Sequence, residues 1–314
     1  MPTSPTTRPH PTEPGIRLAH AGDIEIAYET FGIEEDVPLV LIMGLATQML
    51  GWPDEFCDLL ARAGHYVIRF DNRDIGLSGH LDDAQPVDLA ALTSGDTSSA
   101  AYTLSDMAGD TLGLLDALGL TSAHIVGASL GGMIAQTIAI EHPARVRSLT
   151  SIMSTTGDPA VGQPTAAAMG AVLAPRPADR EGAIERVVEN YRVIGSPGFV
   201  FDEEALRERA ARSYDRSNDP AGVLRQLAAV PASGDRTAEL RSVHVPTLVL
   251  HGVDDPLAAL SGGIATAAAI PSAELITFGG MGHDLPRELW TRVVEAIATL
   301  TRRAETALPS SHVG

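Results

Sequence analysis

The sequence contains no lysine, because all 22 of its basic residues are arginine. Without an ε-amino group the chain has no Walker-A lysine, no Schiff-base lysine for pyridoxal phosphate and no Ser-Lys dyad. Only one cysteine is present, Cys57, which excludes an intramolecular disulfide and cysteine-rich zinc or iron–sulfur sites. These counts exclude cofactors held by a lysine and metals held by several cysteines, and we predict a protein that uses no cofactor and no metal.

Long apolar runs are also missing. A membrane-spanning helix needs about 18 consecutive apolar residues, and no run of that length occurs in the chain. The net charge of −18 disfavours binding to nucleic acid and to anionic membrane surfaces. We predict a cytoplasmic protein with no stable membrane insertion, no nucleic-acid partner and a small-molecule substrate. The oligomeric state stays open.

Short apolar runs alternate with longer helical stretches along most of the chain. Apolar runs of four to eight residues are typical of parallel strands that are covered on both faces. The alternation predicts an α/β fold with a mostly parallel, twisted sheet flanked by helices. Strands are expected at 37–44, 66–71, 123–128, 146–153, 245–251 and 273–278, an edge hairpin at 16–20 and 24–30, and helices at 53–63, 104–118, 130–141, 262–269 and 287–301.

The alternation breaks once, between about residues 157 and 236, where helical segments occur without a buried strand. We predict an inserted helical lid, or cap, at 158–235, on a core made of 16–157 and 236–301. Residues 1–15 are rich in Pro and Thr and lack the apolar run of a secretory signal, so they are expected to be a disordered tail. The polar residues 302–314 are expected to be a loose C-terminal tail.

A Gly-x-Ser-x-Gly pattern, Gly127 to Gly131, lies between a predicted strand and a predicted helix. This is the context of a nucleophile elbow, in which a serine occupies a sharp, strained turn and flanking glycines avoid a clash. The following helix start offers free N–H groups for a developing oxyanion. The pattern predicts Ser129 as a nucleophile.

A serine nucleophile needs a base, and this base lies late in the chain if the sheet follows the order serine, acid, histidine. His283 lies in a glycine-rich turn after the last predicted strand and is the candidate base. The acid is expected after the strand at 245–251, where two aspartates are adjacent. We favour Asp255, which precedes Pro256, and Asp254 stays the alternative.

These residues resemble the α/β-hydrolase superfamily, with a closer likeness to aclacinomycin methylesterase and related actinobacterial esterases and lipases. The resemblance implies Ser129 as nucleophile, His283 as base and Asp255 as orienting acid. It also suggests oxyanion donors at the backbone N–H groups of Leu45 and Leu130. The likeness covers about residues 37–301 and is carried by residues 42–44, 51–56, 69–78, 127–131 and 280–286.

We therefore predict a serine carboxylesterase that cleaves a small to medium carboxylic ester through an acyl-enzyme, with a thioester as the nearest variant. Trp52 and Met133 are candidates for the substrate pocket, with core packing as the alternative for both. Two other functions stay open. One is a cofactor-free C–C hydrolase or perhydrolase with the same triad, and the other is a non-enzymatic small-molecule receptor.

Overall fold

The computed structural model describes residues 15–175, 177 and 179–307. The strands are β1 (Arg17–Ala21), β2 (Ile24–Phe31), β3 (Val37–Ile42), β4 (His65–Phe70), β5 (Ala123–Ala128), β6 (Val146–Ile152), β7 (Thr247–Gly252) and β8 (Glu274–Phe278). The helices are α1 (Asp54–Arg62), α2 (Leu89–Thr93), α3 (Leu104–Ala117), α4 (Leu130–Glu141), α5 (Ala166–Leu173), α6 (Arg180–Ile194), α7 (Glu203–Arg216), α8 (Pro220–Ser233), α9 (Thr237–Leu240), α10 (Leu260–Ala269) and α11 (Trp290–Ala307).

The strands form one eight-stranded sheet in the order β1-β2-β4-β3-β5-β6-β7-β8. Strand β2 runs antiparallel to both of its neighbours, and the pairs from β4 to β8 are parallel. Every predicted strand is present, and its ends differ from the prediction by at most two residues. The mostly parallel sheet and the edge hairpin are therefore confirmed.

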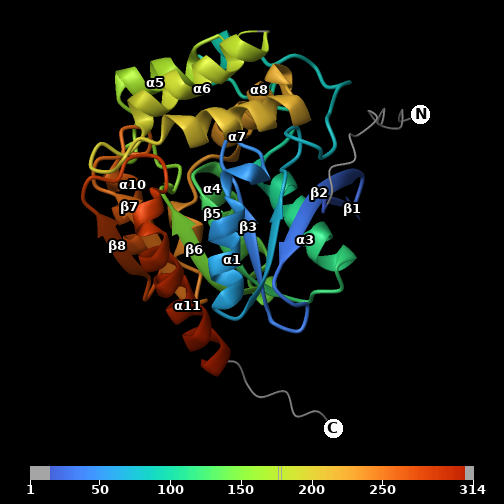
Figure 1. The fold of residues 1–314 in the computed structure, drawn as a ribbon, viewed down its shortest axis with the longest axis vertical. Helices are drawn as coiled ribbons and strands as arrows, with labels where there is room; N and C mark the ends of the chain where they lie inside the picture. The colour runs from blue at the N-terminus through green and yellow to red at the C-terminus, as the bar shows by residue number, and fades with distance from the viewer. Residues whose placement is uncertain (1–14, 176, 178, 308–314) are drawn as a thin grey trace.

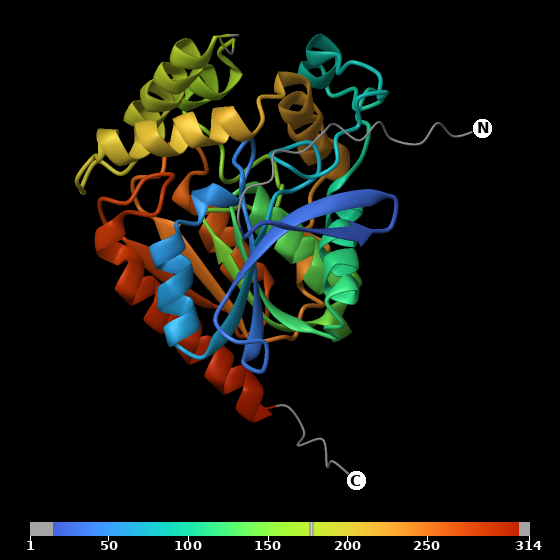
Figure 2. The ribbon, with the colours of Figure 1, turned by 45° about the vertical axis from the view of Figure 1, so that its right-hand side comes forward.

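Helices cover both faces of the sheet, as Figures 1 and 2 show. Successive side chains of a strand point to opposite faces, and in β3 Val40 and Ile42 join the apolar cluster under α3 and α4. Leu39 and Leu41, on the opposite face, join the cluster under α1 and α11. This two-sided burial explains why the inner strands have apolar runs without polar alternation.

Helices α5, α6, α7 and α8 gather beyond one end of the sheet (Figure 1). Between β6 and β7 the described residues form helices and loops only. An aspartate directly precedes three of these helices: Asp179, Asp202 and Asp219 accept hydrogen bonds from first-turn N–H groups of α6, α7 and α8. Such caps satisfy backbone donors that have no partner within the helix.

The C-terminal helix is longer than predicted. Helix α11 extends to Ala307, so residues 302–307 are helical and do not belong to a loose tail. Leu300, Thr301 and Ala304 are buried on one side of it, while Arg302 and Arg303 are exposed. The charged residues that suggested a tail are thus the outer face of an amphipathic helix. Residues 308–314 and 1–14 of the two predicted tails lie outside the described residues.

Within the described part of the chain, the structure contains no helix with both the length and the apolar character needed to cross a membrane.

Candidate active site

Ser129 occupies the sharp turn between β5 and α4. Its φ of 55° lies in the left-handed region, which residues other than glycine rarely adopt, so the backbone of the turn is strained. The flanking glycines permit it, because a Cβ on Gly127 would lie 2.0 Å from the Gly131 carbonyl oxygen. A Cβ on Gly131 would lie 2.1 Å from the oxygen of Ile42. The strand, strained turn and helix of the predicted elbow are therefore present.

Three predicted residues meet in one hydrogen-bonded chain. His283 Nε2 lies 2.9 Å from Ser129 Oγ, and His283 Nδ1 lies 2.8 Å from Asp255 Oδ2. An ionised carboxylate can only accept, so Nδ1 carries the proton and Nε2 is the acceptor that faces the serine hydroxyl. Asp255 and His283 are 5% and 8% exposed, which shields these hydrogen bonds from water. The arrangement can transfer a proton from Ser129 to His283.

The two adjacent aspartates have different contacts. Asp255 Oδ1 accepts hydrogen bonds of 2.9 Å from the N–H groups of Leu257 and Ala258, which leaves Oδ2 for His283. Asp254 Oδ2 instead accepts a 2.7 Å hydrogen bond from the N–H of Gly280. In the structure it is thus Asp255 whose side chain contacts the histidine.

The loop that carries His283 is held by the last residue of α6 and by a serine just after this helix. The N–H of His283 donates to the Ile194 oxygen at 2.7 Å, and the N–H of Gly282 donates to Ser196 Oγ at 2.9 Å. Ser196 also donates to the carboxylate of Asp284. Burial raises the pKa of Asp284, and the hydrogen bond from Ser196 and the charge of His283 oppose that rise. The inserted helices, α5 to α8 between β6 and β7, therefore contact the histidine loop directly.

Two backbone N–H groups lie near the serine. Leu130 is the first residue of α4, and Leu45 follows Gly44, where a Cβ would come within 3.1 Å of Ser129 Cβ. Within the described part of the chain, neither of these N–H groups donates a hydrogen bond. Free donors at this position can stabilise a negative oxygen on a carbonyl that Ser129 attacks.

The candidates for the substrate pocket differ in their surroundings. Trp52 is 2% exposed and its ring stacks on Phe56, with centroids 5.5 Å apart. It thus shows core packing, the alternative that the sequence left open. Met133 lies one turn after Ser129 and is partly buried against the cluster under α3 and α4. Substrate contact by either side chain stays a prediction.

Cys57 is fully buried, and burial raises the pKa of its thiol to about 12. A thiol with this pKa stays protonated near neutral pH and is a poor nucleophile.

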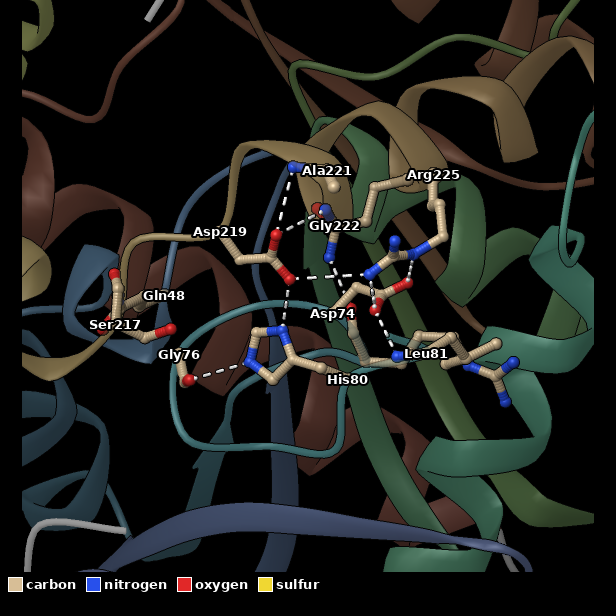
Figure 3. A network of polar contacts seen from close by, with 12 residues as sticks. Gln48, Asp74, Gly76, His80, Leu81, Ser217, Asp219, Ala221, Gly222 and Arg225 are labelled. Carbon is tan, nitrogen blue, oxygen red and sulfur yellow. Dashed lines mark hydrogen bonds and ion pairs between the residues drawn. The ribbon is translucent and has the colours of Figure 1, made fainter. Parts of the chain in front are cut away.

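One group among the described residues, Asp74, His80 and Asp219, brings three candidate metal-ligand atoms within 4.8 Å of one another. Figure 3 shows the guanidinium of Arg225 beside both carboxylates. Arg225 donates to both oxygens of Asp74, at 2.8 and 2.7 Å, and lies 3.5 Å from Asp219. The protein thus supplies its own cation here, and a divalent ion would be repelled by it.

His80 faces a hydrogen-bond acceptor at each ring nitrogen. Nδ1 lies 2.7 Å from Asp219 Oδ2 and Nε2 lies 3.2 Å from the Gly76 oxygen. Burial lowers the pKa of His80, but these hydrogen bonds and the charges of Asp219 and Asp74 outweigh burial, so its pKa is raised. Burial raises the pKa of Asp219, but the hydrogen bonds from His80 and from Gly222 N–H lower it to about 2.

These shifts predict a pH window for the ion pair. A raised histidine pKa contributes stability that is complete below the unfolded value of about 6.5 and is lost as pH rises through the folded pKa. The lowered pKa of Asp219 contributes above its unfolded value of about 3.9 and is lost as pH falls toward 2. His80→Asn should therefore reduce the free energy of unfolding most between about pH 4 and 6.5.

Urea unfolding of wild type and His80→Asn at pH 5.5 and pH 9 measures this difference. The matched control is His20→Asn, because His20 lies 3.7 Å from Glu25 but has a side chain that is 81% exposed, where ion pairs contribute little. A His80→Asn effect of equal size at both pH values would contradict the prediction.

Several residues around the site carry no signal in the sequence. Ser196 and Gln226 contact the loops of His283 and Leu45, although each is far from those loops along the chain. His251 Nε2 lies 2.7 Å from the Ala258 oxygen, beside the loop of Asp255. No motif includes these residues, and the roles of Ser196 and Gln226 depend on the tertiary placement of the helices between β6 and β7.

Comparison with known proteins identifies the family. A family model described as alpha/beta hydrolase fold matches residues 37–286. The chain belongs to this family. Rhodomycin D methylesterase DauP from Streptomyces sp. (strain C5) is 31% identical over 310 residues, which is 92% of this chain and 98% of that protein. The match confirms the predicted fold and the likeness to actinobacterial esterases.

The chain is also similar to two other hydrolases. A 2-hydroxy-6-oxononadienedioate/2-hydroxy-6-oxononatrienedioate hydrolase from Paraburkholderia phymatum is 27% identical over 267 residues, covering 83% of this chain and 85% of that protein. The crystal structure of a hydrolase from Pseudomonas aeruginosa PA01 has a TM-score of 0.69 and 25% identity, and the match covers 94% of this chain and all of that chain.

Proposed function

We propose that this protein is a serine carboxylesterase. The observation that carries the proposal is the hydrogen-bonded chain from Ser129 through His283 to Asp255, at an elbow of an alpha/beta hydrolase fold. The 31% identity to a methylesterase over nearly the whole chain supports an ester as the substrate. The sequence-based prediction of the same function rested on the same residues.

The proposed reaction has two halves. Ser129 Oγ attacks the ester carbonyl carbon while His283 Nε2 takes the hydroxyl proton, and a tetrahedral oxyanion forms. Collapse breaks the C–O bond, the alcohol leaves with the proton from His283, and the acyl group stays on Ser129. Water then attacks the acyl carbon while His283 Nε2 takes its proton. The bond between the acyl carbon and Ser129 Oγ breaks, His283 returns the proton to Oγ, and the acid is released. Asp255 holds the imidazole in the required tautomer throughout.

The oxyanion of both tetrahedral states is proposed to accept hydrogen bonds from the N–H groups of Leu45 and Leu130. Helices α5 to α8 are proposed to act as the lid over this site, within the predicted segment 158–235. A lid of this kind bounds the space for the acyl and alcohol groups. We therefore propose a small or medium ester, such as a methyl ester, as the substrate class.

A second candidate is a carbon–carbon hydrolase. The Paraburkholderia relative is named for a keto diacid without an ester bond, so its hydrolysis has to break a carbon–carbon bond. The same nucleophile and base would serve such a reaction. The higher identity and wider coverage of the methylesterase favour the ester.

Rates on a series of aryl and methyl esters with increasing acyl length test the proposal. We expect short and medium soluble esters to be cleaved faster than long-chain emulsions, because the lid limits the pocket. Ser129→Ala provides the blank for hydrolysis that does not use the site. Faster turnover of emulsified long chains would contradict the proposed substrate class. Cleavage of a 2-hydroxy-6-oxo acid with no ester turnover would support the second candidate instead.

A further inference from the structure

The loop after β3 carries the proposed oxyanion donor Leu45, and it is fixed by a side chain from the inserted helices. The N–H of Ala46 donates to Gln226 Oε1 at 3.1 Å, although the two residues are 180 positions apart. We propose that Gln226 is a positioning residue that orients the Leu45 N–H toward the substrate oxyanion. This proposal rests on the proposed esterase function.

The peptide groups on both sides of Leu45 are held in place. The Gly44 oxygen accepts from the N–H of Thr47 at 3.3 Å, and the Leu45 oxygen accepts from Thr47 Oγ1 at 3.1 Å. Ala46 has a φ of 60°, in the left-handed region, which costs free energy for a residue with a Cβ. The hydrogen bond from Ala46 N–H to Gln226 stabilises this conformation, and it fixes the peptide plane that follows the Leu45 donor.

Gln226 is itself fully buried and fixed at both ends of its amide. It is 0% exposed, and its Nε2 donates to the Arg73 oxygen at 2.8 Å. The amide therefore bridges the loop of Leu45 and the neighbouring loop of Arg73. A buried amide with both ends bonded has one orientation, which makes it suited to hold a backbone group precisely.

Helix α8 is docked where Gln226 can make this bridge. The ion pairs of Arg225 with Asp74 and of His80 with Asp219 connect the first half of α8 to the loop that follows β4, as Figure 3 shows. The backbones also approach closely, because a Cβ on Gly222 would lie 2.3 Å from the Asp74 oxygen. The residue next to Arg225 thereby reaches the loop of Leu45.

Helix α7 contacts the same loop at a second point. Gln48 Nε2 donates to the Ser213 oxygen at 2.7 Å and to the Ser217 oxygen at 3.1 Å. Arg216 donates to Gln48 Oε1 and, at 3.0 Å, to Asp71 Oδ2. Asp71 Oδ1 in turn accepts from the N–H of Met49 at 2.7 Å. The inserted helices thus hold the far end of the loop as well, and Gln226 is the contact nearest to the donor.

The test compares Gln226→Leu with Ser233→Ala. Ser233 lies on the same helix and accepts a 2.8 Å hydrogen bond from Leu104 N–H, so its loss also removes a contact of α8 with the core, away from the loop of Leu45. Loss of a whole oxyanion donor costs about 10²- to 10³-fold in kcat. In Gln226→Leu one donor is misplaced, so we expect kcat to fall about 10- to 100-fold and KM to change less than about threefold. We expect Ser233→Ala to retain wild-type kcat.

Two readouts separate positioning from general destabilisation. The inhibition constant of a trifluoromethyl ketone, whose adduct places an oxyanion in the same site, should rise in Gln226→Leu by about the factor that kcat/KM falls. Hydrogen exchange of the Ala46 amide should accelerate in Gln226→Leu and not in Ser233→Ala. Gln226→Asn keeps a buried amide but is one methylene shorter, and it replaces Gln226→Leu if the leucine variant does not fold.

Unchanged kcat in a folded Gln226 variant would overturn the proposal, and so would an equal loss in Ser233→Ala. These results presuppose an active wild type, so they leave the esterase assignment intact. A wild-type protein that cleaves no ester would instead remove the proposed function, together with the role of Gln226.

Discussion

Ser129→Ala is expected to lower kcat for an activated ester by about four to six orders of magnitude, as removal of a triad nucleophile does. The methyl group cannot form the acyl-enzyme, and His283 then has no hydroxyl proton to accept at its 2.9 Å contact. The residual rate should come from the oxyanion donors and binding alone. Steady-state and single-turnover rates with an aryl ester measure the loss.

Ser154→Ala is the matched control for this variant. The Ser154 hydroxyl donates to the backbone oxygen of Ser129 at 2.8 Å, so it lies beside the nucleophile without contact to His283 in the hydrogen-bonded chain. Loss of one such hydrogen bond should change kcat by no more than about 10-fold. A Ser129→Ala protein that keeps more than a tenth of wild-type activity would remove the serine from the mechanism.

Asp255→Asn is expected to lower kcat by about 10³- to 10⁴-fold. An amide at this position can present an N–H to His283 Nδ1, which stabilises the tautomer with the proton on Nε2 and leaves no acceptor for Ser129. The carboxamide oxygen can still accept from Leu257 and Ala258, so the loop should keep its shape. The loss should therefore appear in kcat and not in the free energy of unfolding.

The neighbouring carboxylate provides the comparison. Asp254 accepts from the N–H of Gly280, which an asparagine oxygen can also do, so Asp254→Asn should retain kcat within about 10-fold. Rates of the two variants on one ester, with unfolding midpoints measured in parallel, decide the assignment. Equal losses in both variants, or a greater loss in Asp254→Asn, would count against Asp255 as the acid.

Much of the site has local signals in the sequence. The elbow could be predicted because the glycines around Ser129 are required by backbone contacts within the turn itself. His283 and Asp255 could be proposed because parallel strands bring their carboxyl ends to one edge of a sheet, where following loops form sites. The residues themselves could not show which of the two adjacent aspartates faces the imidazole, since that depends on the loop hydrogen bonds of Leu257 and Ala258.

The supporting contacts had no comparable signal. Gln226 and Ser196 contact the site only because helices between β6 and β7 dock on loops that are distant in sequence. Nor could the end of α11 be predicted from charge, because Arg302 and Arg303 are polar whether they form a tail or the outer face of a helix. The burial of Ala304, which distinguishes the two, is a tertiary property.

The central claim is that Ser129 is a nucleophile activated by His283. The most direct measurement is reaction of the wild-type protein with a fluorophosphonate, followed by intact mass and peptide mapping. The account predicts one adduct per chain, located on Ser129, and no adduct on Ser129→Ala. An adduct on another residue, or an unchanged adduct on Ser129→Ala, would contradict the account.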